Sequence, residues 1–262
     1  MPFFGGGGGA QSVQDQALDF LFSLGNTRLF RIGHSGSYTR TTGAGGNASL
    51  GNTGGFFILL DAGSAAAGNS KIGYFNPVQA QMGAGGGVND YSKKIVFSMG
   101  GMMRINSTNS VIRVVFGGSG NTTDAPFENQ DGLTAKGFGV EFRLVSSIIQ
   151  ARLIAYDASY VTPSSYTSLT NGFGEAATGD RFFGMVLESL GNGTINLYGA
   201  ESSLSQNVQI SKTPLLTLTG GPTNSTSANR LFEIQVANHQ TNSPTSSPSA
   251  ILQSAIWGLN VS

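Results

Sequence analysis

FGMVLESLGNGTINLYGA, residues 183–200, is the stretch that decides the fold. Two runs with alternating apolar residues flank the tripeptide Gly191-Asn192-Gly193, which is the pattern of an antiparallel hairpin with one face in a core. Glu188, Asn196 and Tyr198 alternate with the apolar residues, so the other face is free to contact water or a partner chain. An isolated hairpin is marginal in water, and the apolar face therefore requires a second layer of structure.

The neighbouring runs supply that layer. The alternation is strongest in residues 138–144 and 149–153, which predict a second hairpin, and residues 230–236 alternate as well. Residues 94–99, 102–105 and 110–116, separated by Gly100-Gly101 and by residues 106–109, predict a meander of three strands. The closing run, residues 251–261, holds the only tryptophan and is expected to be a strand. About twelve strand-like runs and no repeat of 20–50 residues favour one large all-β domain, an antiparallel jelly-roll or concanavalin-like β-sandwich.

The first 50 residues differ in composition. Phe3 and Phe4 precede five consecutive glycines, which is typical of an apolar tip on a flexible tether or of a frayed terminus. Residues 14–24 carry the apolar spacing of a short helix, which includes Leu18, Leu21 and Phe22. Residues 33–55 are rich in Gly, Ser, Thr and Asn and suggest a long loop. We therefore expect an attachment segment at 1–50 and a sandwich domain at 51–262.

Composition excludes several partners. Only 11% of residues are charged, and 14 basic side chains balance 14 acidic ones, so we expect no binding to nucleic acid or to an anionic membrane. The chain has no cysteine, which excludes disulfides and thiolate metal sites. The N-terminus lacks the pattern of a secretory signal, and no apolar run is long enough to span a membrane. These features predict a protein that is assembled in a cytoplasm.

Catalytic patterns are missing. His34 and His239 are the only histidines, no nucleophile or phosphate-binding motif surrounds them, and both are expected to lie on loops. Glu141 and Glu188 are the best candidates for a pair of carboxylates that hydrolyses glycosides, but solvated strand residues are the more common interpretation. Asp124, Asn129 and Asp131 do not match a calcium loop. We expect no catalytic residues, no metal and no cofactor.

A sugar-binding groove needs fewer specialised groups than a catalytic site does. An aromatic platform and a few amide or carboxylate groups are sufficient. Tyr156, Asp157, Tyr160 and Tyr166 provide such a mixture near strand ends. Tyrosines of this kind also pack loops or fill subunit interfaces. They are therefore candidate receptor- or glycan-binding residues, with structural packing as the alternative.

From residue 94 onward, the order VIRVVFGG, a long loop, KGFGVEFRL, IQARLIAYD, RFFGMVLESLGNGTINLYG and ANRLFEIQVANH resembles the concanavalin A-like jelly-roll domains of bacteriophage tail and virion proteins. The MPFFGGGGG opening is similar to the N-termini of phage structural proteins that attach to the virion by a short segment. The resemblance implies a structural or adhesive role, commonly in a homotrimeric fibre, and supplies no catalytic residues.

The sequence therefore predicts a virion protein, a tail fibre that contacts a host surface glycan through its sandwich. Phe3, Phe4, Leu18, Leu21 and Phe22 would attach it to other virion proteins of the tail, baseplate or capsid. The alternatives are a capsid decoration protein and a glycan-degrading enzyme that uses Glu141 and Glu188.

Overall fold

A computed structural model gives the fold of the chain. It describes residues 27–31, 37–43, 45–51, 57–75, 88–105, 107–117, 133, 136–146, 148–168, 181–199, 213–224, 226–227, 232–239, 241–245 and 249–260. The expected attachment residues 3, 4, 18, 21 and 22, and the expected helix at 14–24, lie outside these ranges.

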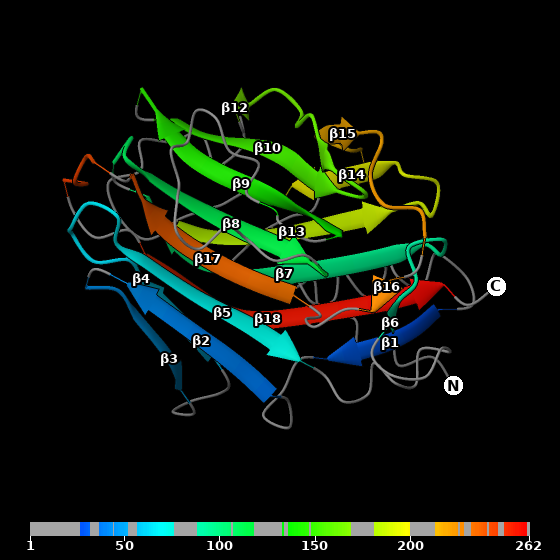
Figure 1. Cartoon of the computed structure of the whole chain (residues 1–262), viewed down its shortest axis with the longest axis horizontal. Helices are drawn as coiled ribbons and strands as arrows, with labels where there is room; N and C mark the ends of the chain where they lie inside the picture. The colour runs from blue at the N-terminus through cyan, green and yellow to red at the C-terminus, as the bar shows by residue number, and fades with distance from the viewer. Residues whose placement is uncertain are drawn as a thin grey trace, which may run out of the picture.

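Two antiparallel sheets form the molecule, and sheet B lies in front of sheet A in Figure 1. Sheet A contains β1 (Thr27–Arg31), β3 (Asn47–Gly51), β4 (Phe57–Asp61), β7 (Ile95–Arg104), β13 (Arg181–Ser189), β14 (Ile195–Gly199), β15 (Leu216–Leu218) and β18 (Ser249–Asn260). Sheet B contains β2 (Ser37–Gly43), β5 (Asn69–Phe75), β8 (Ser110–Phe116), β9 (Gly137–Val145), β10 (Ile148–Tyr156), β11 (Tyr160–Val161), β12 (Thr167–Ser168) and β17 (Phe232–Asn238). The short strands β6 (Val88–Asn89) and β16 (Thr226–Ser227) pair separately. The predicted all-β antiparallel sandwich is confirmed.

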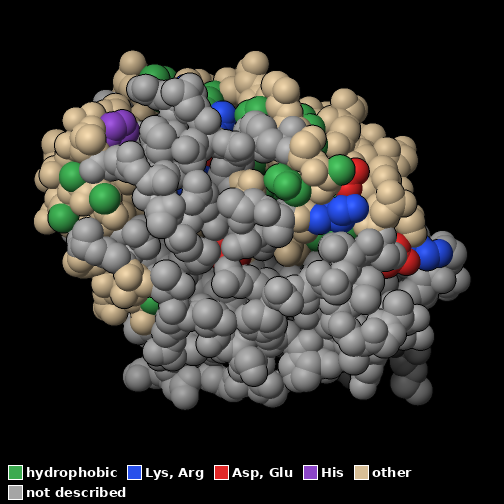
Figure 2. Space-filling model, viewed as in Figure 1, with side chains coloured by type: hydrophobic (Ala, Val, Ile, Leu, Met, Phe, Trp, Pro, Cys, Tyr) green, Lys and Arg blue, Asp and Glu red, His purple; other side chains and the backbone are tan. Residues whose placement is uncertain are grey.

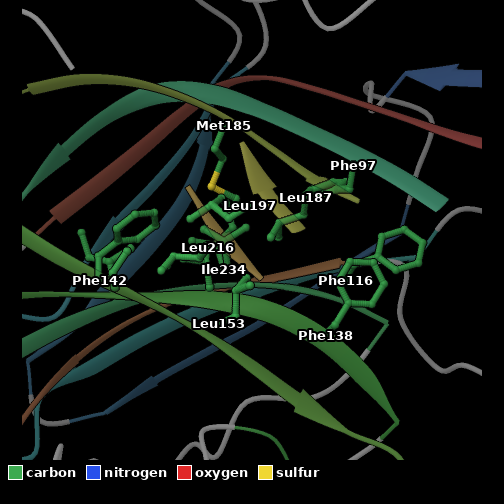
Figure 3. Close-up of a cluster of buried hydrophobic side chains, with 14 of the residues drawn as sticks. Phe97, Phe116, Phe138, Phe142, Leu153, Met185, Leu187, Leu197, Leu216 and Ile234 are labelled. Carbon is green, nitrogen blue, oxygen red and sulfur yellow. The ribbon is translucent and has the colours of Figure 1, made fainter. Parts of the chain in front are cut away.

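The apolar residues of the alternating runs meet between the sheets (Figure 3). Phe97 and Leu187 project from sheet A, and Phe116, Phe138 and Leu153 project from sheet B. The rings of Phe97 and Phe116 have centroids 5.8 Å apart across this interface. Because side chains alternate along a strand, the polar residues between these core positions lie on the outer face of each sheet.

The hairpin β13–β14 is confirmed, with Leu187 opposite Leu197 and Glu188 opposite Asn196. Gly191 and Gly193 have φ values of +82° and +83°, a region that favours glycine. The amide of Thr194 donates to Oδ1 of Asn192 over 3.0 Å, which closes the turn. The second predicted hairpin, β9–β10, and the C-terminal strand β18 are also present.

The N-terminal half departs from the expectations in two places. The sandwich begins before the expected boundary at residue 50, because β1, β2 and β3 pair with β18, β5 and β4. The polar composition of residues 37–51 hides β2 and β3, whose pairing comes from their neighbours in the sheet. The expected meander at 94–116 is wrong: residues 95–104 form one strand through Gly100-Gly101, held between β13 and β18, and β8 belongs to the other sheet.

A buried asparagine ties the two sheets together at one end. Asn238, at the end of β17, donates from Nδ2 to the carbonyls of Gly63 and Ala65 over 2.8 and 2.9 Å, in the connection from β4 to β5. Its Oδ1 accepts a hydrogen bond from Ser110 Oγ. The connection passes so close that a Cβ on Gly68 would lie 2.1 Å from the carbonyl oxygen of Ala62. Asn238 therefore holds the loop that crosses between the sheets.

We predict that Asn238→Ala lowers the free energy of unfolding by about 1–3 kcal/mol, because it leaves partly buried carbonyls without a donor. Denaturant unfolding measures the loss. Asn242→Ala is the matched control, since Asn242 is exposed near the same junction, and it should change stability by less than about 0.5 kcal/mol. Equal losses in the two variants would contradict this role for Asn238.

Candidate functional site

A row of polar side chains crosses the outer face of sheet B. Antiparallel pairing places Arg152 of β10 opposite Glu141 of β9, Glu141 opposite Arg113 of β8, and Arg113 opposite Gln235 of β17. Arg113, Glu141 and Gln235 are at most 2% exposed, although they face away from the core. A charge buried in this way must be paired, and the row supplies the partners.

Glu141 is the centre of this row. Arg113 Nε donates to Oε2 over 2.5 Å, Arg152 Nε donates to Oε1 over 2.9 Å, and the hydroxyl of Tyr166 also donates to Oε1. Arg113 reaches Gln235 through its Nη1 group over 3.0 Å. Burial acts to raise the pKa of Glu141, but the two guanidinium groups and the hydrogen bonds outweigh it, so the pKa lies below its ordinary value. Glu141 is therefore an ionised carboxylate whose oxygens are already occupied.

Tyr166 lies above the two outermost long strands of sheet B. Its segment is fixed to β10 by Ser164, whose amide donates to the carbonyl of Leu153 and whose Oγ accepts from the amide of Leu153. The guanidinium carbon of Arg143 lies 3.4 Å from the centre of the Tyr166 ring, and that of Arg152 lies 4.6 Å from it. Both distances are within the range of cation–π attraction.

Gln150 completes the arrangement from β10. Its Oε1 accepts from Nε and Nη2 of Arg143, over 3.4 and 3.2 Å, and its Nε2 lies 3.5 Å from Ser168 Oγ of β12. We call Glu141, Arg143, Gln150, Arg152 and Tyr166 the Tyr166 cluster. Arg143, Gln150, Arg152 and Tyr166 are half-buried, so the cluster has a sealed carboxylate beneath and a partly exposed layer of donors and aromatic surface above.

A second buried carboxylate lies on sheet A. Glu188 of β13 accepts from Lys94 Nζ over 2.7 Å, Tyr198 OH over 2.6 Å and Asn196 Nδ2 over 3.0 Å. Burial acts to raise its pKa, and the hydrogen bonds from these three residues outweigh that effect and lower it. The same contact with Glu188, together with burial, raises the pKa of Tyr198. Lys94, Tyr198 and Asn196 therefore each donate to Glu188 and serve a structural role.

The alternative of a Glu141 and Glu188 catalytic pair is wrong. Glu141 lies on the outer face of sheet B and Glu188 on the outer face of sheet A, with the core between them. Packed sheets are about 10 Å apart before the outward side chains are added, whereas glycosidase carboxylates lie roughly 5–9.5 Å apart across one groove. A lowered pKa also argues against a general acid, which needs a raised one.

The structure separates the four candidate glycan-binding residues. Tyr166 belongs to the cluster, whereas Tyr156 and Tyr160 are opposite each other at the far end of β10, where Tyr156 packs beside Val115, Leu133 and Ile154. Asp157 pairs with Lys136 Nζ over 2.8 Å. Four residues on a strand span about 13 Å, so Tyr156 is well removed from Arg152 and the Tyr166 cluster.

The arginines and Gln150 were not among the predicted site residues. The signal was present in the sequence: aligning the β9–β10 hairpin on its tight turn sets Arg152 opposite Glu141 and Gln150 opposite Arg143. His239 accepts hydrogen bonds at Nδ1 from the amides of Thr241 and Asn242 on an exposed loop, and His34 lies outside the described residues.

Two other kinds of site, a metal centre and a membrane-spanning helix, are absent from the described residues. No three His, Cys, Asp or Glu side chains of the described residues gather as metal ligands. Within the same part of the chain, no helix has the length and apolarity that a membrane span requires. The described surface in Figure 2 is mostly neutral and polar, with charged side chains in small groups.

No protein-family model and no curated protein matches this sequence. Solved structures with a similar course of the chain include peanut lectin, with 11% identity, coverage of 89% of this chain and 97% of that one, and a TM-score of 0.46. Bacillus licheniformis β-glucanase has 11% identity, coverage of 89% and 98%, and a TM-score of 0.47. A carbohydrate esterase of the Shiga toxin-encoding bacteriophage phi24B has 10% identity, coverage of 85% and 90%, and a TM-score of 0.44. The likeness concerns the fold alone.

The lowered pKa values of Glu141 and Glu188 predict acid sensitivity. Each carboxylate stabilises the fold above its ordinary pKa of 4.5, and this contribution is lost as the pH falls through the lower folded value, because the unfolded chain binds the proton first. Glu141→Gln should cost about 3 kcal/mol at neutral pH and should flatten the decline of stability in the acid range below about pH 5. Denaturant unfolding across this range measures both effects.

Glu188→Gln should behave similarly, with a smaller loss, since its partner Lys94 is partly exposed. The two sites lie on opposite outer faces, so the losses in the double variant should add to within about 0.5 kcal/mol. Strong coupling between them would contradict the separation described here.

Proposed function

We propose that this chain is a bacteriophage tail-fibre protein whose sandwich binds saccharide at the host surface. The virion part rests on the resemblance of the strand order and of the MPFFGGGGG terminus to phage structural proteins. The saccharide part rests on the Tyr166 cluster, which is the observation that carries the proposal.

The cluster has the chemistry of a sugar site. A tyrosine held by its hydroxyl presents ring surface to the apolar face of a sugar, and guanidinium and amide groups beside it donate to hydroxyl oxygens. Thr167 and Ser165 flank Tyr166 and are exposed, which adds further hydroxyl groups. The tyrosine and arginines are fixed by strands and by Glu141, so little conformational entropy remains to be lost on binding.

We place the protein among binding proteins rather than enzymes. Glu141 and Glu188 are the buried carboxylates that the sequence suggested for catalysis, and each is occupied by structural donors. A capsid decoration protein is the alternative within the structural class, and the sandwich alone is compatible with it. Weak binding at single sites would be raised to useful avidity by a trimeric fibre.

Tyr166→Ala is expected to reduce binding to a saccharide identified on an array of bacterial glycans by at least roughly tenfold, because aromatic and donor contacts are lost together. Isothermal titration of the purified chain measures the loss. Tyr166→Phe keeps the ring and should bind within a fewfold of the original. Tyr198→Phe is the matched control, since this tyrosine also donates to a buried glutamate but lies on sheet A.

A folded chain that binds no glycan of the array, or a Tyr198→Phe variant that loses as much affinity as Tyr166→Ala, would refute the saccharide proposal.

The fibre proposal predicts a trimer. Light scattering should give a solution mass about three times the 27.1 kDa of the chain. A variant that starts at residue 27, where β1 begins, should remain trimeric if the sandwich carries the interface, and should lose incorporation into virions if residues 1–26 attach it. A monomer in both forms would favour the decoration protein instead.

A further inference from the structure

Arg143 differs from the two arginines that donate to Glu141. Arg113 and Arg152 both pair with Glu141, whereas Arg143 forms no ion pair with any residue that the structure describes. Its neighbours opposite on the two adjacent strands are Gln150 and Val111, one neutral and one apolar. The guanidinium is therefore a positive charge held in place by neutral groups.

Among the residues that the structure describes, the contacts of Arg143 leave one edge of its guanidinium open. Gln150 Oε1 accepts from Nε and Nη2, and the Tyr166 ring covers one face. Nη1 and Nη2 form a second edge with two N–H donors. Nη1 has no hydrogen-bond partner among the described residues. Arg143 is half-buried, whereas Arg113 is sealed, so solvent reaches part of the Arg143 side chain. Two parallel N–H groups on such an edge match a carboxylate or phosphate.

The charge around this edge is positive. The network holds three guanidinium groups and one carboxylate, and that carboxylate is consumed by Arg113, Arg152 and the hydroxyl of Tyr166. Glu233, the other buried carboxylate on this face, lies on β17, two strands away from β9 or roughly 10 Å across the sheet. An anion that approaches Arg143 therefore meets no competing carboxylate in the cluster.

We propose that the Tyr166 cluster selects acidic saccharides, with Arg143 binding their carboxylate or phosphate group through its Nη1 and Nη2 edge. This inference rests on the proposed saccharide binding and adds the chemical class of the ligand. The Tyr166 ring would lie beside the sugar that carries the anionic group. Selectivity comes from Arg143, because a neutral sugar leaves its half-buried charge without an anionic partner.

The test compares acidic sugars with neutral partners of the same shape. Titration of the full chain uses trigalacturonate against its methyl ester, sialyllactose against lactose, and a phosphorylated mannose against mannose, which separates carboxylate from phosphate recognition. At least one acidic member should bind roughly tenfold more tightly than its neutral partner, and added salt should reduce that difference.

Arg143→Gln should abolish the preference, because affinity for the acidic member should fall at least roughly tenfold further than affinity for its neutral partner. Arg143→Lys keeps the charge without the fork and should retain part of the preference. Lys136→Gln is the matched control, because Lys136 is a half-buried cation beside the far end of β10 that already has Asp157 as its partner. The preference should survive in that variant, and thermal unfolding confirms that each variant is folded.

Equal affinity for acidic and neutral members in every pair overturns this inference and leaves the proposed saccharide binding intact. An equal loss for both members in Arg143→Gln also overturns it, because Arg143 would then act only by holding Tyr166. The absence of binding to any saccharide, acidic or neutral, overturns the proposed function itself.

Discussion

The sealed carboxylate of Glu141 is the constraint on which sheet B depends. Removing water from this charge costs several kcal/mol, and the cost is offset only if Arg113, Arg152 and Tyr166 all reach it. These donors come from β8, from β10 and from the segment before β12. A slip of one residue between β9 and either neighbour would turn Glu141 toward the apolar core, so the same charge that is costly to bury also fixes the register.

The two sheets satisfy their buried carboxylates in different ways. Glu188 has one partly exposed lysine and two neutral donors, so its surroundings are close to charge balance. Glu141 has two guanidinium partners, and a third guanidinium, that of Arg143, lies against the same tyrosine. This surplus of cation over carboxylate distinguishes the described surroundings of Glu141 from those of Glu188. In the proposed function, this surplus lets the Tyr166 cluster serve recognition as well as structure.

Alternation and turn chemistry were sufficient to predict the sandwich, the hairpins β9–β10 and β13–β14, and the strand nature of the C-terminus. They failed where local composition opposes the final structure: β3 lies in a stretch rich in Gly, Ser, Thr and Asn, and Gly100-Gly101 interrupts the apolar pattern of β7. Pairing with neighbouring strands nevertheless makes both of them strands. For the site, Tyr166 was predicted and the arginines were not. A tyrosine is a candidate for sugar binding by its residue type alone. The roles of Arg143 and Arg152 depend instead on strand register and on their contacts with Tyr166, a loop residue whose position cannot be predicted from sequence spacing.

The position of Arg143 also explains why a structural network is suited to recognition. Gln150 restricts the guanidinium in its plane and the Tyr166 ring restricts it from one face, so its rotamer is set before any ligand arrives. Tyr166 is fixed in turn by Glu141, and Glu141 by two strands, so each contact toward the surface depends on a more deeply buried one. Glu141 would therefore act on a ligand only through Tyr166 and Arg152, as a positioning residue. Its burial, which makes it unsuitable for acid catalysis, is what allows the layer above it to hold one geometry.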